Sequence, residues 1–223
     1  MVNYITYNNN KIEYTLIISK RKTSCIQVKK GSIIIKTNNY TPKKIIEEFL
    51  LKNINKVLTI LENQKNNMYK NGSIIKIFGK DFTLNILDNE IDFPYTSGNT
   101  FNIYLDKKDT NINEKIEEIL DKYYLYILKP YAMQSFENFK NKTSLYPNKI
   151  YFKKMKTRWG SCSSKKNISI NILLAKYDKS VIDYVILHEL CHLKEMNHSY
   201  SFWHLVEKYM PNYKEIKKIL NNY

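Results

Sequence analysis

The sequence has few cysteines, few arginines and no long apolar run. Its three cysteines among 223 residues (Cys25, Cys162 and Cys191) are an odd, scattered set, which argues against a disulfide framework. No apolar run approaches the roughly 18 to 20 residues that span a bilayer. The first residues lack a basic start followed by an apolar core, so no signal peptide is visible. We therefore expect a reduced, cytoplasmic protein with no membrane partner.

Charge is plentiful but mostly of one sign, with a formal net charge of +15. Only two of the basic residues are arginines, Arg21 and Arg158, whereas dedicated phosphate-binding proteins favour the arginine fork. A chain rich in Lys, Asn, Ile and Tyr explains this charge more simply than nucleic-acid binding, because no basic-aromatic recognition motif is present. A nucleic acid or nucleotide partner nevertheless stays open, and the sequence indicates nothing about oligomeric state.

Short β-branched runs separated by turns fill much of the first hundred residues, as is typical of strands. Helical spacing of apolar residues follows Thr41-Pro42 to about residue 66, and again from about 111 to 141, where Pro130 predicts a kink or two consecutive helices. No internal repeat is visible. The fold class is therefore predicted as α+β, with a β-rich N-terminal region over 1–108 and a catalytic region over 109–223. The charged segment near 106–111 is the expected boundary.

The stretch Val185-Ile-Leu-His-Glu-Leu-Cys-His192 places an H-E-x-x-H motif in an apolar helix, expected over about 181–195. With 3.6 residues per turn, His188 and His192 lie one turn apart on the same face and can bind one metal ion. Glu189 is then placed to act as a general base toward a metal-activated water. The motif predicts a zinc hydrolase with one Zn²⁺ ion; the alternative is a core helix with two satisfied histidines.

A catalytic zinc site needs a third protein ligand. Candidates downstream of the motif are Glu195, His198, His204 and Glu207. On a continued helix His198 would lie about 15 Å along the axis from His188, too far to share an ion. Asn197 tolerates the left-handed conformation that ends helices, and a turn there would bring His198 back. The predicted metal ligands are therefore His188, His192 and His198.

Two further local patterns precede the metal helix. Ser180, with Asp183 three residues later, resembles a capping box that starts the helix. Strands expected over 149–155 and 167–171 predict a hairpin beside the site, whose edge could hold an extended peptide by backbone hydrogen bonds. Ten basic residues and no acidic residue lie between 138 and 177.

The segments Thr157-Arg-Trp-Gly-Ser-Cys-Ser163, Ile182 to Leu193, Asn197-His-Ser-Tyr-Ser-Phe-Trp203 and Met210-Pro resemble the YgjP-like metal-dependent hydrolases. These are zinc metallopeptidases related more distantly to the SprT and WLM proteases. The resemblance implies a zincin-like helical catalytic domain with a small antiparallel sheet, and the same three ligands with Glu189 as base. It marks residues 158–162 as a signature whose role it leaves open. Arg158, Trp159 and Tyr200 are candidates for substrate binding.

The leading hypothesis is a zinc-dependent metallopeptidase that acts on a peptide or protein substrate. A second hypothesis keeps the metal and changes the substrate to the phosphoanhydride of a nucleotide, for which the basic stretch is suited. A third is a basic DNA-associated module with a structural metal. Glu189 between the histidines argues against the third hypothesis, because a structural site has no use for a base and usually closes with a fourth ligand.

Overall fold

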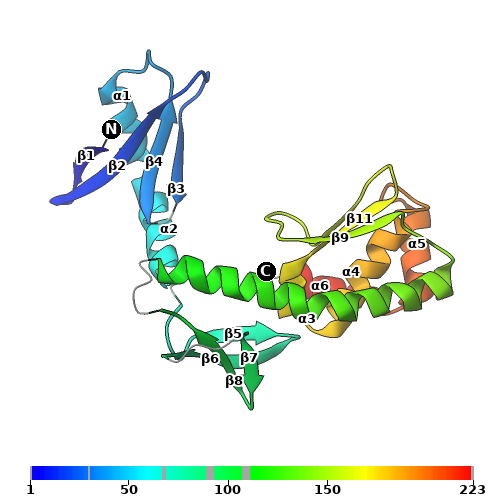
Figure 1. Cartoon of the computed structure of the whole chain (residues 1–223). Helices are drawn as coiled ribbons and strands as arrows, with labels where there is room; N and C mark the ends of the chain where they lie inside the picture. The colour runs from blue at the N-terminus through cyan, green and yellow to red at the C-terminus, as the bar shows by residue number, and fades with distance from the viewer. Residues whose placement is uncertain (1, 30, 67–68, 89–92, 107–110, 222–223) are drawn as a thin grey trace. The chain divides into compact units, whose positions relative to one another are not determined.

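The computed structural model describes residues 2–29, 31–66, 69–88, 93–106 and 111–221. The chain forms two compact units, Met1–Met68 and Tyr69–Tyr223. Strands dominate the first half and helices the second (Figure 1), so the predicted α+β class is confirmed. The expected boundary near residues 106–111 lies largely outside the described residues. The sheet formed by residues 74–104 and the helices that follow it share one hydrophobic core.

The first unit is a four-stranded sheet whose order is β1-β2-β4-β3, packed against two helices. The two hairpins β1–β2 and β3–β4 are antiparallel, and the inner strands β2 and β4 pair in parallel. Asn8 and Asn9 connect β1 and β2 with φ values of 49° and 62°, the left-handed pair that a two-residue type I′ turn requires. The elements are β1 (Val2–Tyr7), β2 (Asn10–Ile18), β3 (Cys25–Lys29), β4 (Ser32–Thr37), α1 (Lys43–Lys52) and α2 (Ile54–Asn66).

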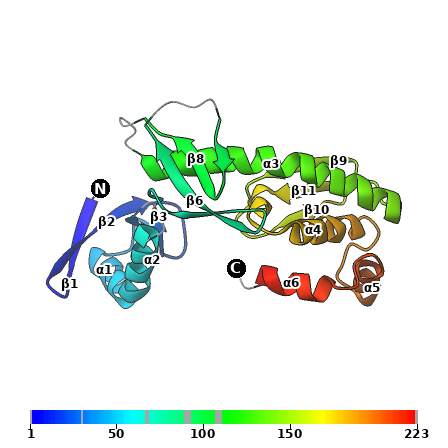
Figure 2. The same ribbon diagram turned by 90° about the horizontal axis from the view of Figure 1, so that it is seen from below.

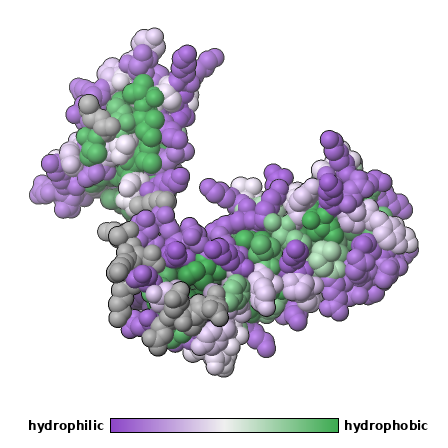
Figure 3. Space-filling model, in the orientation of Figure 1, coloured by the Kyte–Doolittle hydropathy of each residue, from purple (hydrophilic) through white to green (hydrophobic). Residues whose placement is uncertain are grey.

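The core of this unit is formed by the side chains on the inner face of its strands, which alternate with those on the outer face. Every second residue of β4 is buried, and the helices contribute apolar side chains at helical spacing. Several apolar side chains of β1 and β2 stay exposed, among them Val2, Ile17 and Ile18, and Figure 3 shows hydrophobic residues gathered on this unit within a hydrophilic border. The buried core consists of Ile5, Tyr14, Ile33, Ile35, Ile46, Leu50, Ile54 and Val57.

The second unit opens with a sheet of the same topology, in the order β5-β6-β8-β7. Two antiparallel hairpins are again joined by a parallel pairing of their inner strands, β6 and β8. Its first hairpin turns at Phe78 and Gly79, with φ values of 46° and 78°. The strands are β5 (Ile74–Ile77), β6 (Lys80–Leu87), β7 (Tyr95–Ser97) and β8 (Thr100–Tyr104).

The two sheets share one topology and differ in the lengths of their strands, and some of their positions correspond. Counted from the hairpin turns, the buried pair Tyr14–Ile33 corresponds to the buried pair Leu84–Phe101. The following helices carry Ile-Glu-Glu-Phe-Leu at 46–50 and Ile-Glu-Glu-Ile-Leu at 116–120, with the first and last residue of each run buried. In these two buried pairs the ring lies on β2 in one sheet and on β8 in the other.

Helix α3 (Ile112–Thr143) runs the length of the second unit (Figure 1). Its first half packs on the β5–β8 sheet, where the Tyr124 hydroxyl donates to the Lys76 carbonyl at 3.2 Å. Its second half packs on the metal-motif helix. The helix continues through Pro130 as one element, so the alternative of two consecutive helices is wrong. It ends at Ser144, which has a left-handed φ of 56°.

A small three-stranded sheet of order β10-β11-β9 lies beside the metal-motif helix α4. The strands are β9 (Lys149–Lys153), β10 (Gly160–Cys162) and β11 (Asn167–Asn171). The hairpin expected over residues 149–171 is wrong, because β9 and β11 pair in parallel. The antiparallel partner of β11 is β10, which is formed by the Gly-Ser-Cys of the signature. Strand β10 is thus an edge strand next to the motif.

Four helical elements complete the second unit. They are η1 (Ile172–Lys176), α4 (Lys179–Cys191), α5 (Tyr200–Tyr209) and α6 (Tyr213–Asn221). Figure 2 shows α4 between α3 and α6, and nine of its thirteen residues are buried, as expected for a helix that crosses a core. Within the described part of the chain, no helix combines the length and the apolar character needed to cross a membrane.

The start of α4 differs from the predicted capping box. Asp178 is the N-cap, and its carboxylate accepts the Ser180 N–H at 2.9 Å. Asp183 instead accepts hydrogen bonds from Tyr131 (2.9 Å) and Ser135 (2.6 Å) of α3. Burial and the Asp183 carboxylate raise the pKa of Tyr131, so this hydroxyl stays a donor. Asp183 therefore ties α4 to α3.

Candidate metal centre

Helix α4 and the turn that follows it bring three histidines together. The helix ends at Cys191, about one turn earlier than expected, and residues 192–194 form a turn. Asn197 does not adopt the expected left-handed conformation. Its side-chain oxygen accepts the Ser199 N–H at 3.3 Å, and this local bond shapes the bend that returns His198 to the helix.

The ring nitrogens of the three histidines converge. The Nε2 atom of His188 lies 3.2 Å from Nε2 of His192 and 3.0 Å from Nε2 of His198. All three potential ligand atoms lie within 4.8 Å of one another. Zinc–nitrogen bonds of about 2.0–2.1 Å at tetrahedral angles place ligand nitrogens roughly 3.3 Å apart. The three side chains therefore fit one zinc-sized ion.

Hydrogen bonding and burial favour the neutral imidazoles that bind metals. The Nδ1 atom of His192 lies 2.9 Å from the Glu195 carbonyl oxygen; donation to this carbonyl leaves Nε2 as the lone-pair nitrogen. Burial, together with the rings of His192 and His198, lowers the pKa of His188 to about 3. Glu195 was a candidate ligand, and its backbone carbonyl orients a histidine instead.

Aromatic side chains of α5 pack against the histidines, and the sequence analysis gave them no role. The Phe202 ring lies 4.5–4.9 Å, centre to centre, from the rings of His188, His192 and His198. Trp203 stacks on His198 at 5.5 Å. Phe202 and Trp203 are the last two residues of the resembling segment 197–203. Only the folded helix shows that their rings pack against the imidazoles.

Glu189 lies against the edge strand β10. Its side chain is 5% exposed, and a Cβ added at Gly160 would meet Glu189 Oε1 at 2.4 Å, Cγ at 2.6 Å and Cδ at 2.7 Å. Burial raises the pKa of Glu189 to about 8, an effect that the Arg158 guanidinium opposes. Glu189 Oε2 and His188 Nδ1 are buried with no hydrogen-bond partner among the described residues. Gly160 is therefore the position that makes room for this carboxyl group.

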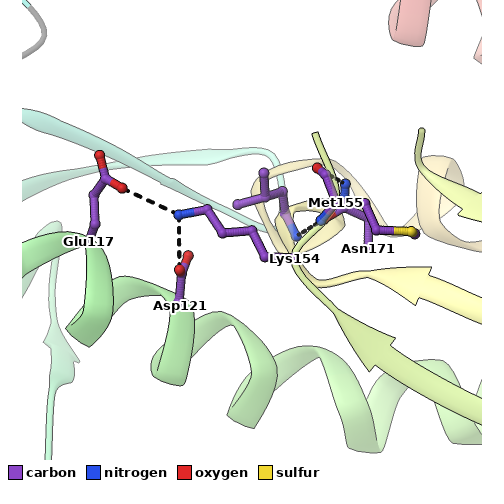
Figure 4. A network of polar contacts seen from close by, with 6 residues as sticks. Glu117, Asp121, Lys154, Met155 and Asn171 are labelled. Carbon is purple, nitrogen blue, oxygen red and sulfur yellow. Dashed lines mark hydrogen bonds and ion pairs between the residues drawn. The ribbon is translucent and has the colours of Figure 1, made fainter. Parts of the chain in front are cut away.

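The loop that carries Arg158 and Trp159 is held by Asn171, another residue that the sequence analysis missed. Its buried amide donates to the carbonyls of Met155 and Arg158, both at 2.9 Å, and its backbone N–H donates to the Trp159 carbonyl at 2.9 Å. Its side-chain oxygen accepts the Met155 N–H at 3.2 Å. Figure 4 shows Asn171 beside Met155, next to the ion pairs of Lys154.

The remaining candidate residues make contacts with residues other than the three histidines. Arg158 is exposed, and Trp159 is half-buried, with its ring 4.9 Å from that of Tyr177. Tyr200 is 85% exposed at the first turn of α5, where its ring stacks on His204 at 6.1 Å. Glu207 pairs with Lys214 at 3.2 Å. His204 and Glu207 are therefore engaged outside the cluster.

Comparison with known proteins gives the class and then the family. A model of the YgjP-like metallopeptidase domain matches residues 22–223, nearly the whole chain. The protein is thus of the metal-dependent protease class. It belongs to the YgjP-like metallopeptidase family, and the resemblance read from the motifs is confirmed.

Two solved structures are similar to a part of the chain. One is the metallopeptidase zymogen abylysin of Pyrococcus abyssi, with 26% identity and a TM-score of 0.38 over 41% of this chain and 93% of that one. The other is the metallopeptidase zymogen jannalysin of Methanocaldococcus jannaschii, with 26% identity and a TM-score of 0.37 over 41% of this chain and 88% of that one. No curated protein matches the chain.

Proposed function

We propose that the protein is a zinc-dependent peptidase in which His188, His192 and His198 hold one zinc ion and Glu189 is the general base. The observation that carries this proposal is the convergence of three imidazole Nε2 atoms beside a buried carboxyl group. When bound, zinc would act as a Lewis acid that polarises a carbonyl, and it would lower the pKa of a bound water molecule to about 7.

The residues of the chain have separate tasks. Glu189 accepts a proton from water at its unpartnered Oε2 atom and passes it to the leaving amine. Gly160 and the walls of the core fix the other side of that carboxyl group. Strand β10 is an edge strand, so its free backbone groups are available to pair with an extended peptide. This arrangement favours a peptide over a nucleotide as substrate.

Arg158 and Tyr200 are proposed to contact the substrate near the bond that is cut. Arg158 is exposed and acts electrostatically on Glu189, and Tyr200 is exposed at the start of α5. Each has a conservative test, Arg158→Gln and Tyr200→Phe. A role in the transition state lowers kcat with little change in KM, whereas a role in binding alone raises KM.

The test uses zinc-loaded full-length protein with unstructured peptides, and nucleoside triphosphates in parallel. We expect peptide hydrolysis by the wild type and at least 1,000-fold slower hydrolysis by Glu189→Gln, which keeps the side-chain shape and one zinc ion per chain. Elemental analysis of His198→Ala is expected to show loss of tight zinc. Retained stoichiometric zinc in that variant would overturn the ligand set. Turnover of triphosphates without peptides would overturn the substrate class.

A further inference from the structure

A cavity of about 690 Å³ lies in the second unit, and no histidine is among its described lining residues. It is bounded by β5, α3, η1, the start of α4 and the end of α6. Most of its wall is apolar, and four aromatic side chains contribute to it: Tyr69, Tyr124, Trp159 and Tyr177. Its volume falls in the range of cavities that bury a small ligand or a large side chain.

The cavity adjoins the proposed catalytic site through two elements. Trp159 lines it, and the next residue, Gly160, is the one that packs against Glu189. Val181 also lines it and lies seven residues before His188 on α4, about 10 Å along the helix axis. An extended peptide advances about 3.3 Å per residue, so this separation corresponds to roughly three residues of substrate.

One cation in the cavity wall lacks an ion pair in the described part of the chain. Lys176 is half-buried and forms no ion pair among the described residues. The nearby carboxylates of Glu117 and Asp121 bind Lys154, at 3.3 and 2.9 Å (Figure 4). Burial lowers the pKa of Lys176, which reflects the cost of holding this ammonium group out of water.

The other charged residues of the wall are already engaged. Lys76 pairs with Asp81 at 2.8 Å. Asp178, the acidic residue among the described lining residues, caps α4 by accepting the Ser180 N–H. The cavity therefore combines an apolar, aromatic wall with one cation that forms no ion pair among the described residues, and this combination is complementary to an apolar group that carries a carboxylate.

We propose that this cavity is a specificity pocket, which binds a bulky apolar side chain of the peptide about three residues from the bond that is cut, while Lys176 pairs with a carboxylate on that residue or its neighbour. The carboxylate is either the C-terminus of the peptide or an adjacent Asp or Glu side chain. This inference rests on the proposed peptidase function and names its substrate class. Peptides with lysine at the pocket position are excluded by charge.

Binding is measured separately from cleavage, with the zinc-loaded Glu189→Gln variant and fluorescence anisotropy. The probes are N-terminally labelled peptides of five alanines followed by phenylalanine, with a free carboxylate, with an amide, or with Phe-Asp-amide at the end. We expect the free acid, the Phe-Asp-amide, or both to bind at least 10-fold more tightly than the neutral amide. The two acidic probes identify the source of the carboxylate.

Lys176→Met in the same background keeps the length of the side chain and removes its charge. It is expected to abolish the preference for acidic probes and to leave binding of the amide unchanged. Lys76→Met is the matched control, because Lys76 lines the same cavity but has Asp81 as a partner, and the preference should survive. Equal binding of all three probes would overturn the proposal even if Lys176→Met failed to fold.

Cleavage by the wild type separates the two proposals. If the acidic probes bind preferentially but no peptide is cut, the pocket stands and the peptidase function fails. If peptides are cut with no preference for an apolar and acidic position, the function stands and the pocket is refuted. Cleavage about three residues before the phenylalanine supports both.

Discussion

Gly160→Ala is the substitution that tests the arrangement of the site most directly. The added methyl group would lie 2.4–2.7 Å from three atoms of the Glu189 side chain, which is closer than real Cβ atoms approach. Glu189 is 5% exposed and lies against Gly160 of β10, so the displaced side chain has little room. The carboxyl group must therefore move, or the strand must separate from the helix.

Gly160→Ala is expected to lower both the stability of the protein and its catalytic rate. Overpacking of a filled interior costs about 1–3 kcal/mol of unfolding free energy. Displacement of a general base costs about 10²–10⁴-fold in rate. We expect Gly160→Ala to lose stability in that range and to lower kcat/KM at least 100-fold. Zinc stoichiometry should stay at one, because the three histidines are not among the atoms nearest the added methyl group.

Three assays on the full chain check this prediction: peptide hydrolysis, elemental analysis and denaturant unfolding. The control is the same change made in a Glu189→Ala background, where all three clashing atoms are absent. There Gly160→Ala is expected to be neutral or mildly stabilising, since the methyl group fills the space left by the glutamate. Full activity of Gly160→Ala, or equal destabilisation in both backgrounds, would refute the contact.

The other predictions concern the loop, the helix cap and the metal. Asn171→Leu leaves backbone groups of Met155 and Arg158 unsatisfied and should cost about 2–4 kcal/mol in urea unfolding. Asp178→Ala should cost about 1 kcal/mol near pH 7. The N–H groups at the start of α4 lower the pKa of Asp178. The contribution of this carboxylate to the free energy of unfolding is therefore complete above about pH 4 and is lost as the pH falls through the lowered pKa. In a pH series, the difference in stability between wild type and variant should vanish there. Free zinc at 100 times its Kd should stabilise the wild type by about 2.7 kcal/mol in thermal unfolding, and an EDTA wash should remove this gain.

Much of the site could be predicted from sequence because its chemistry is local. His188 and His192 are one helical turn apart, and that spacing alone places them on one face. The return of His198 was also predicted, but for a different reason from the one observed: a side-chain bond from Asn197 shapes the bend, in place of a left-handed residue. Short-range spacing thus identified the correct neighbours even where the turn chemistry differed.

The remaining features depend on contacts between distant segments. Gly160 and Glu189 are 29 positions apart, and Asn171 reaches back across 16 residues to Met155. The parallel pairing of β9 with β11 could not be distinguished from a hairpin, because alternation gives a strand's faces but not its partner. The cavity with Lys176 requires five separate elements. None of these features has a signature within a single window of sequence.

The two sheets have the same topology, so a strand of one sheet could pair wrongly with the other sheet while the chain folds. The inner strands β4 and β8 are similar in length and take the same place in their sheets. Their cores discourage the exchange. One copy pairs a large ring with a smaller aliphatic residue, Tyr14 with Ile33, and the other reverses the order, Leu84 with Phe101. If β4 and β8 changed places, one of these buried pairs would consist of two rings and the other of two aliphatic side chains, so the first would be overfilled and the second would leave a void. The opposite order of ring and aliphatic residue in the two pairs thus favours the pairing of each strand within its own sheet.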